Sequence, residues 1–320
     1  MSAPELLLVV DGGGTKTQAI VTDLAGTVLG RGLGPSSNLH NVGFDETCRA
    51  VTVAIEGALT HVLGPGLRAP GPGWRSARIA AACFGLSGVD APEDEAQVSR
   101  WVREQEVAAR FMVVNDAELV LAGGTPDGWG VALISGTGSV CLGRSPEGRT
   151  MRVGGWGPLM GDEGSGYDIA VRALRLATQA ADGRAQAPTL LQAVLQHWSL
   201  PDPALLIRYV HDPARTPAEV AGLATVVLAL AAKGDAAARG VVDDAARELA
   251  RHVDTVVCTL RLQRAPLAIG GGLLGGHLRR ALLAALRSEL GPVKYVSDPS
   301  QGAVVLARQL LVRAIPGGEA

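Results

Sequence analysis

LLLVVDGGGTKT, residues 6–17, decides the fold of this 320-residue chain. Its first five residues form a continuous apolar run, which is typical of a strand buried on both faces of a sheet. The run ends at Asp11, and the three glycines that follow allow the backbone to approach an anion closely and to present N–H groups to it. The alternative is a simple tight turn in which the aspartate has no role. Two consecutive glycines would suit such a turn well, but three suit it less well. The stretch therefore predicts a phosphate-binding hairpin made of Gly12, Gly13, Gly14, Thr15 and Lys16, with Asp11 placed to hold Mg²⁺ directly or through water.

The same pattern recurs further along the chain. Residues 130–134 form another apolar strand, which ends at Gly136-Thr137-Gly138-Ser139, and strands are expected at 140–144 and 149–153. The first loop is likewise followed by expected strands at 17–23 and 27–31. The second loop alone is a weak signal, but it occupies the equivalent place in a repeated unit. Two such hairpins that face each other across a cleft would clamp a polyphosphate and its metal.

The remaining elements complete an α/β fold. Helices are expected at residues 43–62, 92–104, 167–180, 189–198, 237–262, from about 277, and at 299–313, with strands at 78–86, 111–114, 267–269 and 294–297 and a surface loop at 64–73. The clearest helix, 237–262, carries apolar residues along one stripe. We predict two related lobes that face each other, an N-terminal lobe at 1–124 and a C-terminal lobe at 125–298 with inserted helices.

Asp116 lies just past the end of the strand expected at 111–114. A carboxylate at this end of a strand in an open α/β fold faces the ligand crevice. There it can act as the general base on a hydroxyl nucleophile. Capping of the following helix explains the position equally well, and Asn115 could share that task.

Two more glycine-rich segments suggest binding. Residues 154–166 place Trp156, Asp162 and Glu163 among glycines, which suits a sugar, because its C–H faces pack on an aromatic ring and its hydroxyls bind carboxylates. The alternatives are a Trp156 ring plugged into the core and a charge pair at a helix start. Residues 270–275 match G-x-G-x-x-G, but too little chain follows for a Rossmann domain. We expect a glycine turn that a nucleotide base or sugar approaches.

Composition limits the classes of partner. With 29 Lys+Arg against 31 Asp+Glu, the formal net charge of −2 gives no electrostatic reason to expect nucleic acid or an anionic membrane. The longest uncharged apolar run, 220–232, is shorter than the roughly 18–20 residues that span a bilayer, and the apolar start is too short for a signal peptide. Four widely spaced cysteines predict neither a zinc site nor a disulfide framework. We expect a cytoplasmic protein.

Seven motifs in order resemble the N-acetylglucosamine kinase family, which belongs to the actin/hexokinase/heat-shock-chaperone superfamily of ATPases. They cover about residues 6–310 and are DGGGTKT at Asp11, SSN at Ser36, NDAE at Asn115, ISGTGS at Ile134, GGWG at Gly154, GDEGS at Gly161 and GGGL at Gly270. The resemblance implies two ribonuclease-H-like lobes with ATP and a hexosamine in the central cleft. It also implies that the last helix, 299–313, returns to the first lobe.

The resemblance implies roles for single residues as well. Gly136, Thr137 and Gly138 would form the second phosphate loop, Gly271 and Gly272 fall in the adenosine segment, and Asp116 falls where the family keeps its catalytic base. The positions that would contact the sugar and its N-acetyl group are Asn38, Asp116, Ser139, Gly155, Trp156 and Asp162.

Three related groups fit less well. The ROK sugar kinases carry a zinc cluster of cysteines, which the spacing of this chain cannot build. The CoA-dehydratase activators place a cysteine near the second phosphate loop, where this chain has Ser135. The transcription-repressor relatives begin with a helix-turn-helix, whereas the first strand expected here starts at Leu6.

We therefore expect an ATP- and Mg²⁺-dependent kinase that phosphorylates the 6-hydroxyl of an amino sugar, with N-acetylglucosamine as the first choice. A glucosamine kinase is the nearest alternative, because Asp162 or Glu163 could meet an ammonium at C2. An accessory ATPase or sugar sensor without phosphotransfer is the alternative from another class. The expected partners are the amino sugar and ATP, a homodimer is left open, and no nucleic acid or membrane is expected.

Overall fold

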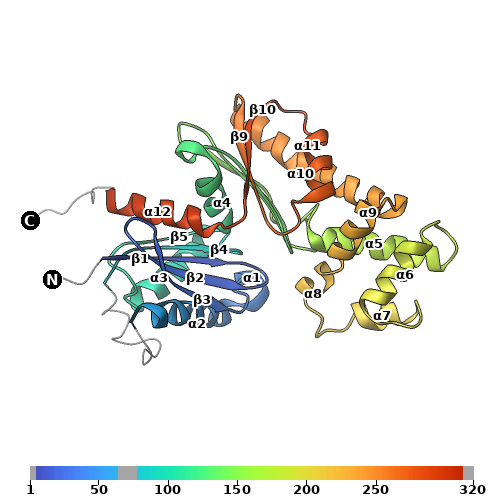
Figure 1. The fold of residues 1–320 in the computed structure, drawn as a ribbon, viewed down its shortest axis with the longest axis horizontal. Coiled ribbons are helices and arrows are strands. Elements are labelled where there is room, and N and C mark those ends of the chain that lie inside the picture. Colours follow the sequence, from blue (N-terminus) through green and yellow to red (C-terminus); the bar gives the residue numbers. More distant parts are fainter. Residues whose placement is uncertain (1–4, 64–77, 313–320) are drawn as a thin grey trace, which may run out of the picture. The chain divides into compact units, whose positions relative to one another are not determined.

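The computed structural model describes residues 5–63 and 78–312 (Figure 1). The chain divides into two compact units. Unit 1 comprises Met1–Gly128 and Val296–Ala320, and unit 2 comprises Trp129–Tyr295. Each unit is built on a five-stranded mixed sheet, which confirms the predicted α/β class.

The sheet of unit 1 has the order β3-β2-β1-β4-β5. Its strands are β1 (Leu6–Gly12), β2 (Thr17–Asp23), β3 (Val28–Gly34), β4 (Ile79–Leu86) and β5 (Phe111–Val114). β1 pairs antiparallel with β2 and parallel with β4, and β4 pairs parallel with β5. The hairpin predicted from the opening stretch is therefore present, with the glycines in its turn.

The longer helices of unit 1 follow the predictions, and two short elements are additional. They are α1 (Leu39–Val42), α2 (Phe44–Leu63), α3 (Pro92–Glu104), α4 (Asp116–Gly124), the 3₁₀ turn η2 (Pro126–Gly128) and α12 (Ser300–Val312). The short helix α1 and the 3₁₀ turn η2 were not predicted. The loop expected at 64–73 lies outside the described residues.

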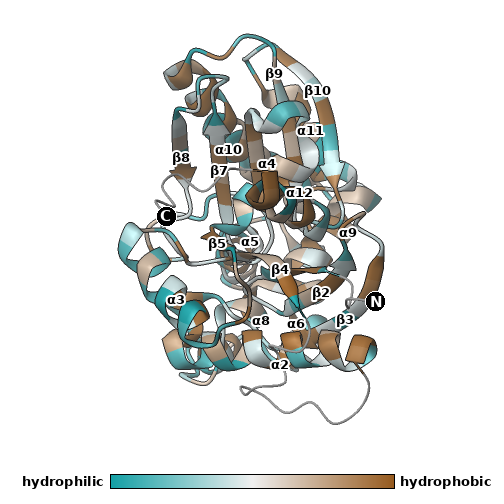
Figure 2. Ribbon diagram, turned by 90° about the vertical axis from the view of Figure 1, so that its left-hand side faces the viewer, coloured by the Kyte–Doolittle hydropathy of each residue, from teal (hydrophilic) through white to brown (hydrophobic). Residues whose placement is uncertain are grey.

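Alternate residues of β1 pack on opposite faces of the sheet. Leu6, Leu8 and Val10 belong to one apolar cluster, with α2 and α3, whereas Leu7 and Val9 belong to another, with α4 and α12. In Figure 2, α3 is mostly hydrophilic and α4 mostly hydrophobic. Because both faces are covered, every residue of the strand core is apolar, which explains the unbroken run in the sequence.

The sheet of unit 2 has the order β10-β9-β6-β7-β8. Its strands are β6 (Gly130–Ser135), β7 (Ser139–Arg144), β8 (Thr150–Gly154), β9 (Ala265–Gly270) and β10 (Leu290–Val296). β6 pairs antiparallel with β7 and parallel with β9, so that the three strands β6, β7 and β8 repeat the β1-β2-β3 meander of unit 1.

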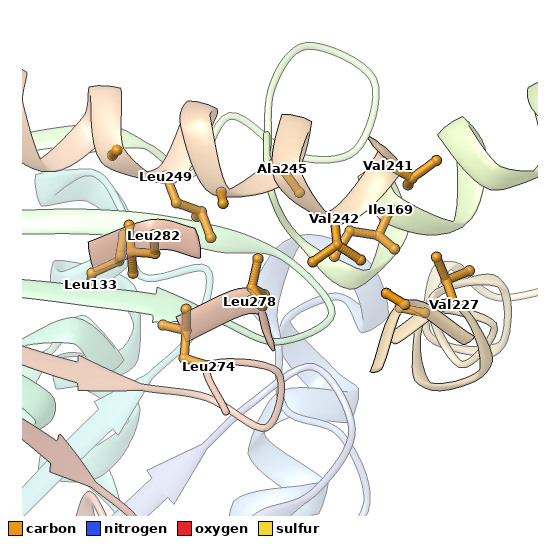
Figure 3. Packing of buried hydrophobic residues seen from close by; sticks show 14 of the residues in the cluster. Leu133, Ile169, Val227, Val241, Val242, Ala245, Leu249, Leu274, Leu278 and Leu282 are labelled. Carbon is orange, nitrogen blue, oxygen red and sulfur yellow. The ribbon is translucent and has the colours of Figure 1, made fainter. Parts of the chain in front are cut away.

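Seven helices of unit 2 are described. They are α5 (Gly166–Ala181), α6 (Pro188–His197), α7 (Leu205–Val210), α8 (Pro217–Ala221), α9 (Ala224–Lys233), α10 (Ala236–Leu260) and α11 (Gly276–Ala285). The sequence did not predict α7, α8 and α9. Figure 3 shows their common core, in which Val242 and Leu249 of α10 lie with Ile169 of α5 and Leu278 of α11.

Among the described helices, none is by itself both long and apolar enough to cross a bilayer. The sharply bent pair Pro217–Lys233 and Ala236–Leu260 meets the length and composition requirements jointly.

Candidate functional site

The candidate residues of unit 1 gather at one edge of its sheet. β1, β4 and β5 run parallel, with Gly12 paired to Leu86 and Gly85 paired to Val114. Their carboxyl ends therefore lie at the same edge, which is where ligands bind in open α/β sheets. The first glycine loop, Ser87 and the Asn115-Asp116 pair follow these three ends.

The first glycine loop is closed by backbone hydrogen bonds. The amide of Gly13 donates to the carbonyl of Lys16 over 3.0 Å, and the carbonyl of Gly12 accepts from the amide of Ser87 over 2.7 Å. A Cβ on Gly12 would lie 2.2 Å from the hydroxyl oxygen of Ser37. Glycine is therefore required at position 12 by packing, in addition to any role in binding.

Asn38 is predicted to bind a sugar, and both the oxygen and the nitrogen of its side-chain amide are hydrogen-bonded. Its side-chain oxygen accepts from the amide of Asn41 over 3.1 Å and caps α1, and its nitrogen donates to the hydroxyl of Ser87 over 2.8 Å. The side chain is therefore preorganised next to the first glycine loop. Ser87 was missed by the sequence analysis, although it follows a predicted strand just as Asp116 does.

Asp116 is the first residue of α4, and Asn115 is the N-cap. The side-chain oxygen of Asn115 accepts from the amide of Ala117 over 3.0 Å, and its nitrogen donates to Asp90 over 2.8 Å. The alternative that Asp116 caps the helix is therefore wrong.

Asp11 lies near the end of β1, and its carboxyl group has a raised pKa. Burial and the negative charge of Asp298 raise its pKa to about 6, while Lys16 acts in the opposite direction. A nearby cation would offset both causes, so the position suits Mg²⁺, which proteins hold through one or two carboxylates together with phosphate oxygens and water. Within residues 5–63 and 78–312, no group of three or more His, Cys, Asp or Glu side chains is placed to hold a metal.

The candidate residues of unit 2 gather at the corresponding edge of its own sheet. β6 and β9 are parallel, with Ile134 paired to Gly270, so the second glycine loop and the Gly271-Gly272 turn leave the same edge. The amide of Gly136 closes the loop by donating to the carbonyl of Gly138 over 2.9 Å. The turn is packed so closely that a Cβ on Gly271 would lie 2.2 Å from the carbonyl oxygen of Ser135.

The predicted sugar segment of unit 2 is hydrogen-bonded to the second glycine loop. The hydroxyl of Ser139 donates to the carbonyl of Glu163, and the hydroxyl of Ser135 donates to the carbonyl of Gly164, both over 2.8 Å. The amide of Gly166 donates to the carbonyl of Gly136 over 2.8 Å. Two segments predicted separately thus form one connected structure.

Trp156 and Asp162 differ in exposure. The indole of Trp156 lies on the surface, with 66% of the residue exposed, so the alternative that it plugs the core is wrong. Asp162 is only 8% exposed. It also precedes Ser165, the N-cap of α5, so the alternative of a charge pair within the helix start is wrong.

Two further residues support the Trp156 segment and were not foreseen. The guanidinium of Arg152 donates to the carbonyls of Gly154 and Gly155. The ring of His252, on α10, lies against Gly154 and reaches the carboxylate of Glu163 at 3.5 Å. Neither lies in a recognisable motif. Arg152 directly precedes the segment in the chain, whereas only the three-dimensional packing brings His252 here.

The predicted site residues thus fall into two groups, one in each unit. In unit 1 they are Asp11, Gly12, Gly13, Gly14, Thr15, Lys16, Asn38 and Asp116. In unit 2 they are Gly136, Thr137, Gly138, Ser139, Gly155, Trp156, Asp162, Gly271 and Gly272.

Known proteins are similar in sequence to this chain over nearly its whole length. An N-acetylmuramic acid/N-acetylglucosamine kinase from Clostridium acetobutylicum is 35% identical over 306 residues, which are 93% of this chain and 97% of that protein. An N-acetyl-D-glucosamine kinase from Dictyostelium discoideum is 32% identical over 317 residues, covering 95% and 98% of the two chains. These relatives confirm the resemblance seen in the motifs.

A solved structure of a similar protein agrees with these two sequence relatives. A candidate N-acetylglucosamine kinase from Chromobacterium violaceum superposes with a TM-score of 0.72 at 28% identity, covering 95% of this chain and 99% of its own. The model of the BadF/BadG/BcrA/BcrD ATPase family matches residues 8–307. With this match across most of its length, the chain belongs to the BadF/BadG/BcrA/BcrD ATPase family.

Proposed function

We propose that this protein is an ATP-dependent kinase that phosphorylates the 6-hydroxyl of an amino sugar, with N-acetylglucosamine as the acceptor. The observation that carries the proposal is the 35% identity to a kinase named for N-acetylmuramic acid and N-acetylglucosamine, over 93% of this chain. It is supported by the placement of the motif residues at the carboxyl edges of both sheets.

In this proposal the two glycine loops bind the phosphates of ATP. Hydrogen-bond donors in both loops stabilise the negative charge on the transferred phosphoryl group. These donors are the backbone amides of Gly12, Gly13, Gly14, Gly136 and Gly138 and the hydroxyls of Thr15 and Thr137. Lys16 adds a positive charge, and Gly271 and Gly272 accommodate the adenosine. When bound at Asp11, Mg²⁺ would neutralise part of the phosphate charge.

Asp116 is the proposed general base. Its carboxylate takes the proton of the sugar 6-hydroxyl as that oxygen forms a bond to the γ-phosphorus, and the bond from the γ-phosphorus to the bridging oxygen breaks to release ADP. The sugar is oriented by Asn38, Ser139, Gly155, Trp156 and Asp162. The exposed indole of Trp156 offers an apolar face for the sugar ring.

The test is a coupled ADP-release assay with equal concentrations of N-acetylglucosamine, N-acetylmuramic acid, glucosamine and glucose. The proposal predicts the highest kcat/KM for N-acetylglucosamine. A higher value for N-acetylmuramic acid would move the assignment to that sugar, and a higher value for glucosamine would mean that the site recognises an ammonium. ATP hydrolysis with no sugar phosphate formed would show an ATPase of another kind and end the proposal.

A further inference from the structure

Asp162 is a buried carboxylate in a surface segment. It is 8% exposed and adopts the left-handed backbone conformation, with φ of 56°. Non-glycine residues in this conformation cost free energy, and such strain persists only where the surrounding contacts hold it. The contacts that hold Asp162 therefore bear on its role.

Those contacts join two different segments. The carboxylate accepts hydrogen bonds from the backbone amide of Ser139, at the end of the second glycine loop, and from the backbone amide of Gly157, next to Trp156. It also lies against the loop itself, since a Cβ on Gly138 would be 2.8 Å from its Oδ2 atom. One side chain thus links the proposed phosphate loop to the proposed sugar segment.

We infer that Asp162, in addition to its proposed contact with the sugar, holds these two segments together and so couples nucleotide binding to sugar binding. The inference rests on the proposed function, in which one of the linked segments contacts phosphate and the other contacts the sugar. A ligand that orders one segment orders the other through the shared carboxylate, and the second ligand then binds at a smaller entropic cost. Coupling between two sites is reciprocal, so each ligand strengthens the binding of the other by the same factor.

A second hydrogen bond connects the same two segments. The hydroxyl of Ser135, fully buried at the end of β6, donates to the carbonyl of Gly164 over 2.8 Å. It joins the same two segments without touching Asp162, so it contributes to the coupling independently. The side chain of Glu163 is 40% exposed and reaches towards His252.

The experiment measures the Kd of N-acetylglucosamine by calorimetry, with and without the non-hydrolysable ATP analogue AMPPNP and Mg²⁺. In the wild type the analogue is expected to tighten sugar binding at least about fivefold, the lower end of usual coupling factors. Asp162→Asn keeps the size of the side chain but loses one charged acceptor, and is expected to reduce the factor to below about twofold. Ser135→Ala is expected to reduce it in the same direction.

Glu163→Gln is the matched control, because it removes a charge from the neighbouring residue and leaves the backbone carbonyl that Ser139 uses. It is expected to retain the wild-type factor. The inference is overturned if Asp162→Asn retains that factor, or if the wild type shows none. Should Asp162→Asn not fold, or bind the sugar too weakly for its Kd to be measured, Ser135→Ala decides, and an unchanged factor there overturns the inference. Phosphate transfer by the wild type tests the proposed function separately, so the two failures are distinguishable.

Discussion

The side-chain amide of Asn115 donates to Oδ1 of Asp90 over 2.8 Å, while its oxygen caps helix α4. Asn115 is thus fixed from two sides, and Asp116 follows it directly as the first residue of the helix. These contacts of Asn115 therefore hold the start of α4, where the proposed base lies.

Asn115→Ala is expected to lower the free energy of unfolding by about 1 kcal/mol, because it removes the cap of α4. Asn41→Ala is the matched control, since only the backbone amide of that exposed residue takes part in capping α1. Urea unfolding measures both. Equal stability of the two variants would contradict the assignment of Asn115 as the cap.

Gly12→Ala is expected to destabilise the protein by about 1–3 kcal/mol, the usual cost of overpacking. The added Cβ would lie 2.2 Å from Ser37 Oγ and 2.6 Å from a methyl carbon of Leu86. At the adjacent Gly13 a Cβ would meet its nearest neighbour at an ordinary 3.7 Å. Gly13→Ala should therefore change stability by less than about 0.5 kcal/mol. The prediction fails if thermal or urea unfolding gives both variants the same stability.

Gly271→Ala should cost more than Gly272→Ala for two physical reasons. Gly271 has φ of 92°, which is strained for a residue with a Cβ, and that Cβ would lie 2.2 Å from the carbonyl oxygen of Ser135. A Cβ on Gly272 would have no described atom within 4 Å. We expect a loss of about 2–4 kcal/mol for the first variant and a small change for the second, measured by urea unfolding. A reversed order would mean that the turn has a different conformation.

His252 makes the stability of unit 2 dependent on pH. Burial lowers its pKa more than the nearby carboxylates of Glu163 and Glu248 raise it. Below the usual histidine pKa of about 6.5 the unfolded chain therefore binds more protons than the folded chain, and stability falls as the pH falls. The free energy of unfolding of the wild type, minus that of His252→Gln, should decrease between pH 8 and pH 5. A difference that stays constant or increases would contradict this.

Strong local patterns predicted most of the fold. The β1–β2 and β6–β7 hairpins, the helices α2, α3 and α10 and the strands β4 and β5 all have either an unbroken apolar run or a clear helical stripe. Helices α7, α8 and α9 were not predicted, because their short apolar segments, punctuated by Pro and Gly, give no sustained periodicity. Helix α1 has only four residues and depends on the Asn38 cap.

The positions of candidate residues relative to the strands were predictable where chemistry and strand ends coincide, as at Asp11 and Asp116, and their roles stay predictions. The arrangement of the site was not predictable where long-range packing decides. The contact of His252 with Glu163 joins residues from α10 and a loop far away in sequence. The effect of Asp298 on the acidity of Asp11 likewise depends on the chain returning to unit 1.

Product analysis after incubation with ATP, Mg²⁺ and N-acetylglucosamine tests the central claim most directly, with the phosphorylated position assigned by ³¹P–¹H NMR. The account predicts phosphate on the 6-oxygen of the sugar for the wild type. It also predicts a turnover lower by about 10²- to 10⁴-fold for Asp116→Ala, the usual contribution of a positioned base, with the nucleotide Kd unchanged. Phosphate at another position, no sugar phosphate at all, or an Asp116→Ala variant with nearly full turnover would contradict it.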